Sequence, residues 1–328
     1  MSVKESARSL LEHLLLRGIK PWRVSLRAAG SQLAQSLGYD SACKLLIVNA
    51  DDFGVHPDVN KAILGCFENE AITSTSVMVP CPAFVAAARA SRSGALDVGV
   101  HLTLTSEWPK YRWAPVLGAA SVPSLVDSTG FLPRTVREVF AHARLEEVEV
   151  ELRGQIDRAL DAGIDVTHID NHMFALQGAR RDYYELYVRL AQDYCLPLRA
   201  IRRTLKQRWT GVDRNPLTHD MSAPLSPDHI VFAGWYDYHN AAEYWSEALS
   251  QLPAGVTEIY CHPGFCTSSL AGDLEDAPRR QAEYSFFTSK SASEMIATRG
   301  IVRIGYRALR DVMRTDPRFP PRTSVAAK

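Results

Sequence analysis

The pattern of hydrophobic residues changes near residue 44, and the change predicts an α/β fold. From Lys44 onwards, short apolar and β-branched runs alternate with longer stretches of helical periodicity. Such alternation predicts parallel strands joined by crossover helices. Strands are expected at residues 45–49, 76–79, 97–102, 166–169, 196–200, 230–233, 258–261 and 301–304. Seven or eight mainly parallel strands favour a deformed (β/α) barrel, closed or nearly closed.

Helices are expected between these strands, several of them opening with proline or aspartate, as helix N-termini prefer. They are expected at residues 57–69, 82–91, 133–162, 182–194, 241–251 and 291–298. Residues 107–132 and 207–227 are rich in Pro, Trp, Ser and Asp and lack periodicity. This composition is typical of long functional loops, here over one face of the barrel.

The same pattern divides the chain into three parts. Residues 1–42 carry an amphipathic run that stops near Pro21, which predicts a helical extension packed outside the barrel or on a partner subunit in a homo-oligomer. Residues 43–315 are expected to form the barrel domain, and residues 316–328 a flexible tail. The N-terminal apolar run is too short and too interrupted for a signal peptide or a membrane span.

Charge and cysteine usage narrow the class of protein. Lys plus Arg and Asp plus Glu both total 37, so no global basic field would draw the chain to nucleic acid or anionic membranes. A basic cluster from Arg199 to Arg208 is interpreted as a solvated loop or helix face. Six cysteines are scattered without close pairs, which is typical of reduced core residues in a cytoplasmic protein.

The first candidate for chemistry is the pair Asp51 and Asp52, which ends the apolar run 47–50 and precedes the glycine at 54. Carboxylates at the carboxyl end of a barrel strand lie where such barrels place their active sites. Taken alone, the pair could equally cap the next helix or form an Asx turn.

Histidines follow three further predicted strands. His101 interrupts an apolar strand, and His262 precedes a Pro-Gly turn. His168, Asp170 and His172 crowd another strand end, where alternation places the first two on one side and His172 just beyond the strand. Each feature is weak alone, and a lone buried histidine is more often a core residue. Together they follow four strands whose carboxyl ends could meet at one barrel mouth.

An Asp/His/His set with open positions suits a first-row divalent ion such as Zn. Metal-bound histidines usually donate their other ring nitrogen to a nearby carboxylate, and Asp170 is the candidate for that role. A carboxylate beside the ion with no ligand duty of its own can act as a general base on water that the ion activates.

At these residues the sequence resembles the YdjC-like carbohydrate deacetylases, a family that includes chitooligosaccharide deacetylase and hopanoid-associated deacetylases. The elements ADDFG, GVHLT, THIDNH and CHPGF occur in the family's order and approximate spacing, and the resemblance runs from about residue 44 to 311. It implies a deformed (β/α) barrel that removes an N-acetyl group from an amino sugar.

The resemblance also implies roles for individual residues. The family's metal ligands match Asp52, His101 and His172, and its general base matches Asp51. His262 matches the histidine that stabilises the tetrahedral intermediate or protonates the leaving amine. One divalent ion is expected, Zn or Mg first and Mn or Co as alternatives, with an N-acetylated sugar or oligosaccharide as the substrate.

Two features bear on the substrate. Residues 173–176 read Met-Phe-Ala-Leu where several relatives have further histidines, so the chitooligosaccharide substrate is not carried over. Trp108 and Trp113 lie in the long loop and could be aromatic platforms for sugar rings or packing anchors.

Three other functions compete with deacetylation. A metal-dependent hydrolase of a phosphate or another ester would use similar residues, but the chain has no P-loop. A glycosidase needs two carboxyl groups about 5 to 9.5 Å apart, which adjacent aspartates do not predict. A non-catalytic carbohydrate-binding barrel would have no need of the full set of catalytic residues present here.

Overall fold

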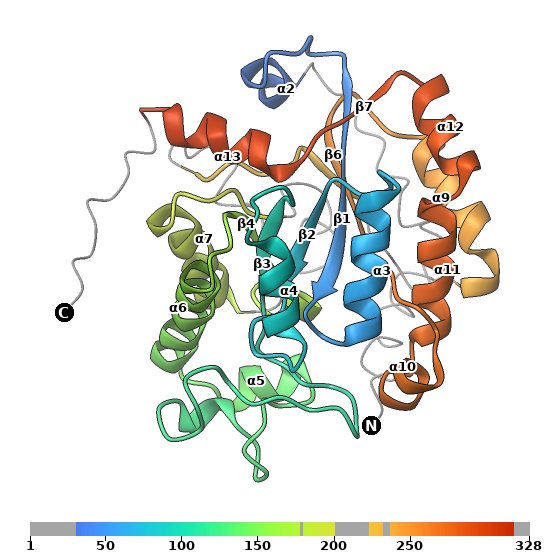
Figure 1. The fold of residues 1–328 in the computed structure, drawn as a ribbon. Helices are drawn as coiled ribbons and strands as arrows, with labels where there is room; N and C mark the ends of the chain where they lie inside the picture. Colours follow the sequence, from blue (N-terminus) through green and yellow to red (C-terminus); the bar gives the residue numbers. More distant parts are fainter. Residues whose placement is uncertain (1–30, 178–179, 201–222, 232–236, 318–328) are drawn as a thin grey trace, which may run out of the picture.

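The computed structural model describes residues 31–177, 180–200, 223–231 and 237–317 (Figure 1). The amphipathic run near residues 10–21, most of the expected loop 207–227 and nearly all of the tail lie outside the described residues. Among the helices that are described, none is both long enough and apolar enough to cross a membrane.

Within the described residues, seven parallel strands form one curled sheet in the order β4-β3-β2-β1-β6-β5, with β7 beside β1. Nearly all of β1 is buried, as expected for a central parallel strand covered on both faces. The strands are β1 (Lys44–Phe53), β2 (Ser74–Val77), β3 (Val98–Leu102), β4 (Val166–Asn171), β5 (His229–Val231), β6 (Gly255–Cys261) and β7 (Ile301–Arg303).

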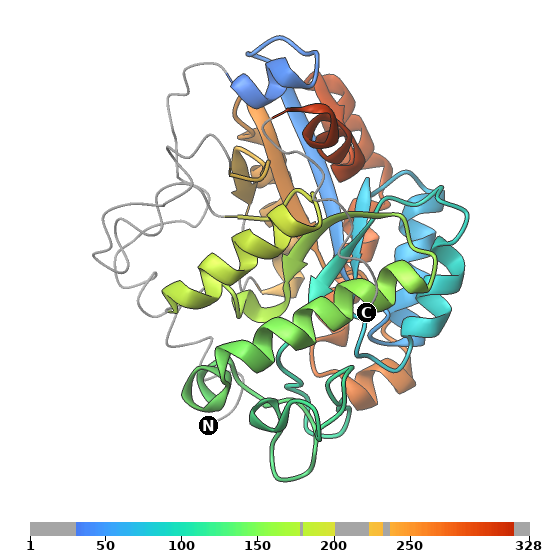
Figure 2. The ribbon, with the colours of Figure 1, turned by 90° about the vertical axis from the view of Figure 1, so that its left-hand side faces the viewer.

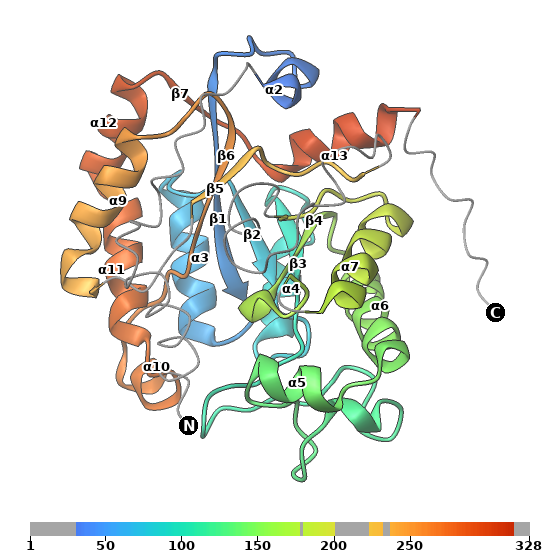
Figure 3. The same cartoon turned by 180° about the vertical axis from the view of Figure 1, so that it is seen from behind.

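Helices surround the outside of this curl (Figures 1 and 3). They are α2 (Gln32–Ser36), α3 (Pro57–Glu68), α4 (Phe84–Ser91), α5 (Val136–His142), α6 (Leu145–Asp161), α7 (Arg181–Asp193), α9 (Ala241–Ser250), α10 (Ser268–Asp273), α11 (Ala277–Phe287), α12 (Lys290–Thr298) and α13 (Tyr306–Thr315). Short 3-10 turns are η1 (Pro123–Leu125), η2 (His172–Phe174) and η4 (Tyr238–Asn240). The α/β class and the deformed (β/α) barrel predicted from the sequence are confirmed.

The curl continues past β4 through a segment that the sequence analysis predicted to be a strand. Residues 196–200 form only an isolated parallel bridge, between Leu198 and Ile169 of β4. On its other side, Leu198 donates a backbone hydrogen bond to Leu225. Pro197 has no backbone N–H to donate to a β-sheet hydrogen bond, which accounts for the irregular pairing of this segment. This segment nevertheless carries Arg199 into the barrel.

The helices differ from the prediction in two respects. The single helix expected over residues 133–162 is two helices, because Ala143 and Arg144 have extended backbone. The Arg144 amide donates a hydrogen bond to Ser124 of the long loop. The break depends on this tertiary contact, and no proline or glycine at residues 143–144 marks it in the sequence. Helices α10, α11 and α13 were not predicted, and α11 proves to be part of the candidate site.

The amino ends of the strands are covered by α2, which falls within the predicted N-terminal extension (Figure 2). Leu33 and Ala34 of α2 join a cluster of buried side chains that includes Leu45, Val256 and Tyr306. The larger core cluster lies between the sheet and the surrounding helices. The carboxyl ends of the strands point to the bottom of Figure 1.

Candidate active site

The two aspartates at the end of β1 both reach the interior, although neighbouring residues of a strand normally point to opposite faces. Asp52 has a positive φ of 69°, and the pairing of β1 with β2 shifts register between Ala50 and Phe53. A non-glycine residue in this region is strained and is often found at functional sites. Asp51 and Asp52 are both buried. The local irregularity of β1 therefore brings two adjacent carboxylates into one site.

The three residues matched to metal ligands converge on one point. Oδ1 of Asp52 lies 3.4 Å from Nε2 of His101 and 3.5 Å from Nδ1 of His172. All three side chains are buried, and one donor atom from each lies within 4.8 Å of the others. His172 belongs to η2, just beyond β4, as alternation predicted. These residues come from three strand ends that are far apart in the sequence.

Each of these ligand candidates is held at its other polar atom. Nδ1 of His101 lies 2.8 Å from Asp170, and Nε2 of His172 lies 2.9 Å from Glu107. Oδ2 of Asp52 accepts from Arg280 at 2.7 Å.

The remaining atom of each residue faces the shared point, and Oδ1 of Asp52 is buried without a hydrogen-bond partner among the described residues. Buried polar atoms usually have a partner. A buried oxygen without one, facing two imidazole nitrogens, fits a divalent cation.

The electrostatic environment is consistent with a cation site. Burial acts to raise the pKa of Asp52, but Arg280 and His172 outweigh it and hold that pKa well below its usual range. Burial acts to lower the pKa of His172, yet the Glu107 and Asp52 carboxylates raise it to about 10. For His101, burial is likewise outweighed by Asp170 and Asp51, which raise its pKa. The surrounding carboxylates thus stabilise positive charge at this point.

Asp51 is held differently, by Arg199. The Arg199 guanidinium donates to both oxygens of Asp51 at 2.7 Å and to Glu258 at 2.8 Å. Asn49 also donates to Asp51 at 2.8 Å. Arg199 is only 2% exposed, so the interpretation of the basic cluster as a solvated face is wrong for this residue. The rest of that cluster, residues 201–208, lies outside the described residues.

Asp51, His101 and Asp170 also lie close enough together to suggest a second metal site. However, Arg199 approaches Asp170 to 3.0 Å and Asp51 to 2.7 Å, so a cation already compensates both carboxylates. Asp170 is in addition bonded to Nδ1 of His101, the nitrogen on the far side from Asp52. We therefore interpret this set as a group of side chains that supports the first site; the role of Asp170 behind a metal-bound histidine stays a prediction.

His262 stands on the other side of Asp51, just after β6. Its Nε2 lies 3.9 Å from Oδ2 of Asp51, and its Nδ1 lies 3.7 Å from Glu283 of α11. The His262 amide also donates to Glu283. The His262 side chain is 18% exposed, more than those of the three ligand candidates. It is therefore more accessible to a bound molecule than they are.

His168 lies deeper in the barrel than the ligand candidates. Its ring stacks on Tyr306 with a centroid distance of 3.8 Å and an angle of 13°. A Cβ atom on Gly99 would lie 2.5 Å from this ring, so the glycine makes room for it. Burial lowers the pKa of His168 to about 3. The structure thus places His168 as a neutral residue of the barrel core, beneath Asp170.

Trp108 and Trp113 are 8% and 2% exposed, and both pack against His172 with ring centroids 6.5 Å away. Their rings also pack on each other at 5.6 Å. Little of either ring is left for a sugar to stack on. Of the two roles considered from the sequence, this burial favours the packing anchor.

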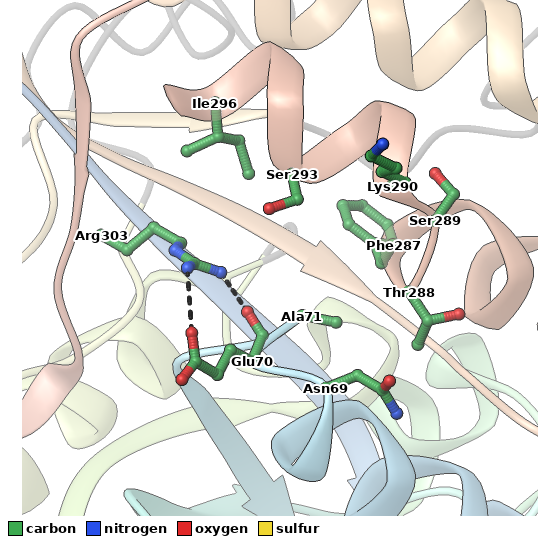
Figure 4. Close-up of a pocket in the computed structure, with 10 residues that line it drawn as sticks. All are labelled: Asn69, Glu70, Ala71, Phe287, Thr288, Ser289, Lys290, Ser293, Ile296 and Arg303. Carbon is green, nitrogen blue, oxygen red and sulfur yellow. Dashed lines mark hydrogen bonds and ion pairs between the residues drawn. The ribbon is translucent and has the colours of Figure 1, made fainter. Parts of the chain in front are cut away.

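A pocket of about 280 Å³ lies away from this site, at the amino end of the sheet (Figure 4). It is lined by the turn after α3, the turn between α11 and α12, and Arg303 of β7, which pairs with Glu70. None of the residues discussed above lines it. Among the described residues, the candidate site at the carboxyl end of the barrel and this pocket are thus separate.

Several partners of the site were not predicted from the sequence, namely Glu107, Arg199, Glu258, Arg280 and Glu283. Arg280 and Glu283 lie three residues apart on α11, which was not predicted as a helix. Glu107 follows the GVHLT element in a segment without periodicity, and its only sequence signal was proximity to that element. Long-range hydrogen bonds, not local patterns, place these side chains.

Comparison with known proteins agrees with this geometry. Residues 45–298 match the family model of the YdjC-like proteins. A carbohydrate deacetylase from Enterococcus faecalis is 32% identical over 81% of this chain and 98% of its own length. A carbohydrate deacetylase from Geobacillus stearothermophilus is 31% identical over 80% of this chain and 96% of its own length.

A similar crystal structure comes from Enterococcus faecalis V583, of a protein named for a suspected role in cellobiose-phosphate cleavage. It has a TM-score of 0.67 and 29% identity, and the match covers 81% of this chain and 99% of that one. The match to the family model spans the strand ends that carry Asp51, Asp52, His101, His172 and His262. The chain therefore belongs to the YdjC-like family.

Proposed function

We propose that this protein is a divalent-metal-dependent deacetylase that hydrolyses an N-acetyl group of an amino sugar and releases acetate. The names of its relatives, carbohydrate deacetylases at 31% and 32% identity over about four fifths of the chain, support the substrate class. The observation that carries the proposal is the convergence of Asp52, His101 and His172 around an otherwise unpartnered buried oxygen.

Asp52 would bind the ion through Oδ1, His101 through Nε2 and His172 through Nδ1. Zn or Mg are the ions we favour, with Mn or Co as alternatives. A divalent ion in such a site supplies Lewis-acid chemistry, polarising a carbonyl and lowering the pKa of water. Asp170, Glu107 and Arg280 orient the three ligands through hydrogen bonds to His101, His172 and Asp52, respectively.

Asp51 and His262 are proposed to move the protons. Asp51 accepts a proton from the attacking water, and the fork of Arg199 holds its carboxylate in place. His262 donates a proton to the departing amine nitrogen, and Glu283 fixes its ring and backbone. The 3.9 Å between Asp51 and His262 allows the two groups to act on one small acyl group. Acetate and a free amino sugar result.

The alternatives are less well supported. A glycosidase needs two carboxyl groups on either side of the cleaved bond, whereas Asp51 is bound to an arginine and Asp52 faces two histidines. A non-catalytic barrel would not need a strained Asp52 or buried partners behind each ligand. No feature of the described site favours a phosphate or another ester over an amide.

The test is acetate release from a panel of N-acetylglucosamine compounds, free, oligomeric and lipid-linked. The purified protein is first stripped with a chelator and then supplied separately with Zn, Mg, Mn or Co. Metal-restored acetate release is the expected result. A protein that binds metal but releases no acetate from any compound would contradict the proposal.

The variant Asp51→Asn tests the division of roles. Turnover should fall by about 100-fold or more, as for loss of a general base, while metal binding is retained. Asp161→Asn, on the exposed end of α6, is the matched control and should leave turnover unchanged. Unchanged turnover in Asp51→Asn would remove Asp51 from the mechanism.

We further propose a cytoplasmic location. None of the cysteines in the described residues forms a disulfide, and Cys66, Cys81 and Cys261 are buried. Reduced cysteines of this kind are usual in cytoplasmic proteins. A homo-oligomer stays a prediction, because the N-terminal run on which it rests lies outside the described residues.

A further inference from the structure

We propose that Glu107 is a positioning residue of the metal centre, which decides which ring nitrogen of His172 faces the ion and thereby sets metal affinity. This inference rests on the metal dependence in the proposed function, but not on the identity of the substrate. Glu107 lies in the loop after β3, and its side chain is only 5% exposed.

The contact is directed at one nitrogen. Nε2 of His172 lies 2.9 Å from Oε1 and 3.1 Å from Oε2 of Glu107. A neutral imidazole has one N–H and one lone pair, and an ionised carboxylate can only accept. In the neutral form that can bind a metal ion, the Nε2–H is therefore directed at Glu107, and the lone pair is left on Nδ1, which lies 3.5 Å from Asp52.

The other histidine is oriented in the opposite sense. Asp170 holds His101 at Nδ1, so His101 offers Nε2 to the same point. The two imidazoles therefore use different ring nitrogens, each selected by its own buried carboxylate. Without Glu107, the ring of His172 could turn over or carry its proton on the nitrogen that must face the ion.

The loop around Glu107 is built to hold it still. Trp108 and Trp113 follow Glu107 in the loop, and both rings pack on the ring of His172. Trp113 donates its backbone N–H to Ser106 and its indole N–H to the carbonyl of Thr105, both at 3.0 Å.

Further along the loop, Arg112 donates to Ser106, to Asp127 and to the carbonyl of Leu132. Glu147 of α6 accepts hydrogen bonds from the backbone N–H and the hydroxyl of Ser124, and so fixes the loop to this helix. These hydrogen bonds fix the conformation of the loop and so keep Glu107 in contact with His172.

The experiment measures metal affinity directly, by competition with a chromophoric chelator, for the wild type, Glu107→Gln and Glu107→Ala. We expect Zn affinity to fall by about 10–100-fold in Glu107→Ala, as for loss of other carboxylates behind metal-bound histidines. The fall should be smaller in Glu107→Gln, because the amide oxygen still accepts from Nε2. The visible absorption spectrum of the Co-substituted protein should change in both, since the ligand geometry changes.

Glu146→Gln is the control, because it makes the same change at an exposed position of α6. Its metal affinity and Co spectrum should match the wild type. Unaltered affinity and spectrum in both Glu107 variants would overturn the inference, as would an equal loss in Glu146→Gln. If Glu107→Ala does not fold, the Gln variant decides alone.

Failure of this inference is distinguishable from failure of the proposed function. A wild-type protein that binds no divalent ion would overturn the metal dependence and the role of Glu107 together. Unaltered binding in the Glu107 variants, with acetate release intact in the wild type, would overturn the role of Glu107 alone.

Discussion

Arg199 donates one hydrogen bond to each oxygen of Asp51, both at 2.7 Å, from a guanidinium that is almost fully buried. The same group donates to Glu258 and lies 3.0 Å from Asp170. One buried cation thus compensates three buried carboxylates. The proposed base, the anchor of His101 and a deeper glutamate all depend on its position.

Substitution of Arg199 should therefore affect stability and activity separately. Arg199→Ala leaves three buried carboxylates without their cation and should lower the free energy of unfolding by about 3–5 kcal/mol. Arg199→Lys keeps the charge but not the planar fork, so we expect a folded protein whose kcat falls by about 100-fold. Urea unfolding and acetate release measure the two effects.

The control is Arg189→Ala, which removes an arginine that pairs with Glu149 at the surface. Surface pairs of this kind contribute about 0–1 kcal/mol, so stability should change little and turnover should not change. Wild-type kcat in Arg199→Lys would show that the bidentate contact with Asp51 is not needed.

Gly99 is predicted to be intolerant of any side chain. A Cβ atom there would lie 2.5 to 2.6 Å from three atoms of the His168 ring, which is itself stacked on Tyr306. Gly99→Ala should lower the free energy of unfolding by about 1–3 kcal/mol or more, because the ring has nowhere to move. Gly272→Ala in α10 is the control: nothing lies within 4 Å, and the change should be neutral or stabilising by up to about 1 kcal/mol. Equal stability of the two variants would contradict the packing argument.

His168 should make the fold sensitive to acid. Burial lowers its pKa to about 3, from an ordinary value of 6.5. The unfolded chain therefore binds this proton below pH 6.5 while the folded protein does not. The stabilisation is present above pH 6.5 and is lost as the pH falls towards 3, by about 1.4 kcal/mol per pH unit.

The variant His168→Gln has no titrating group at this position. Its free energy of unfolding should therefore fall less steeply than that of the wild type as the pH falls from 6 to 5. Urea unfolding of the chelated proteins measures both slopes. His142→Gln, at an exposed position of α5, is the matched control. Identical slopes for the wild type and His168→Gln would show that the buried ring can be protonated in the folded state.

Asp97 should have an effect of the opposite sign. Burial raises its pKa from 3.8 to about 6, although Thr167 and the backbone of Arg307 donate hydrogen bonds to it. Its contribution to stability is present below pH 3.8 and is lost as the pH rises through 6. Relative to the wild type, Asp97→Asn should gain about 2–2.5 kcal/mol between pH 4 and pH 7. Asp161→Asn should show no such gain, and a pH-independent difference for Asp97→Asn would refute the shift.

The strand pattern and the four motif positions were predictable because they depend on local sequence. Apolar runs mark buried parallel strands, and the polar residues that end them mark the carboxyl edge of the sheet. Thus Asp51, Asp52, His101, His172 and His262 could be named without coordinates. The break between α5 and α6 could not, because it depends on a contact between Arg144 and the distant Ser124.

The sequence by itself determined the barrel class and the side chains that end its strands, since periodicity and strand ends are properties of adjacent residues. Only the tertiary structure decided how those side chains are held. Arg199 and Glu107 act across 148 and 65 residues of sequence, and Arg280 acts across 228. Hydrogen bonds over such separations follow from packing and burial, which leave no periodic trace in the chain.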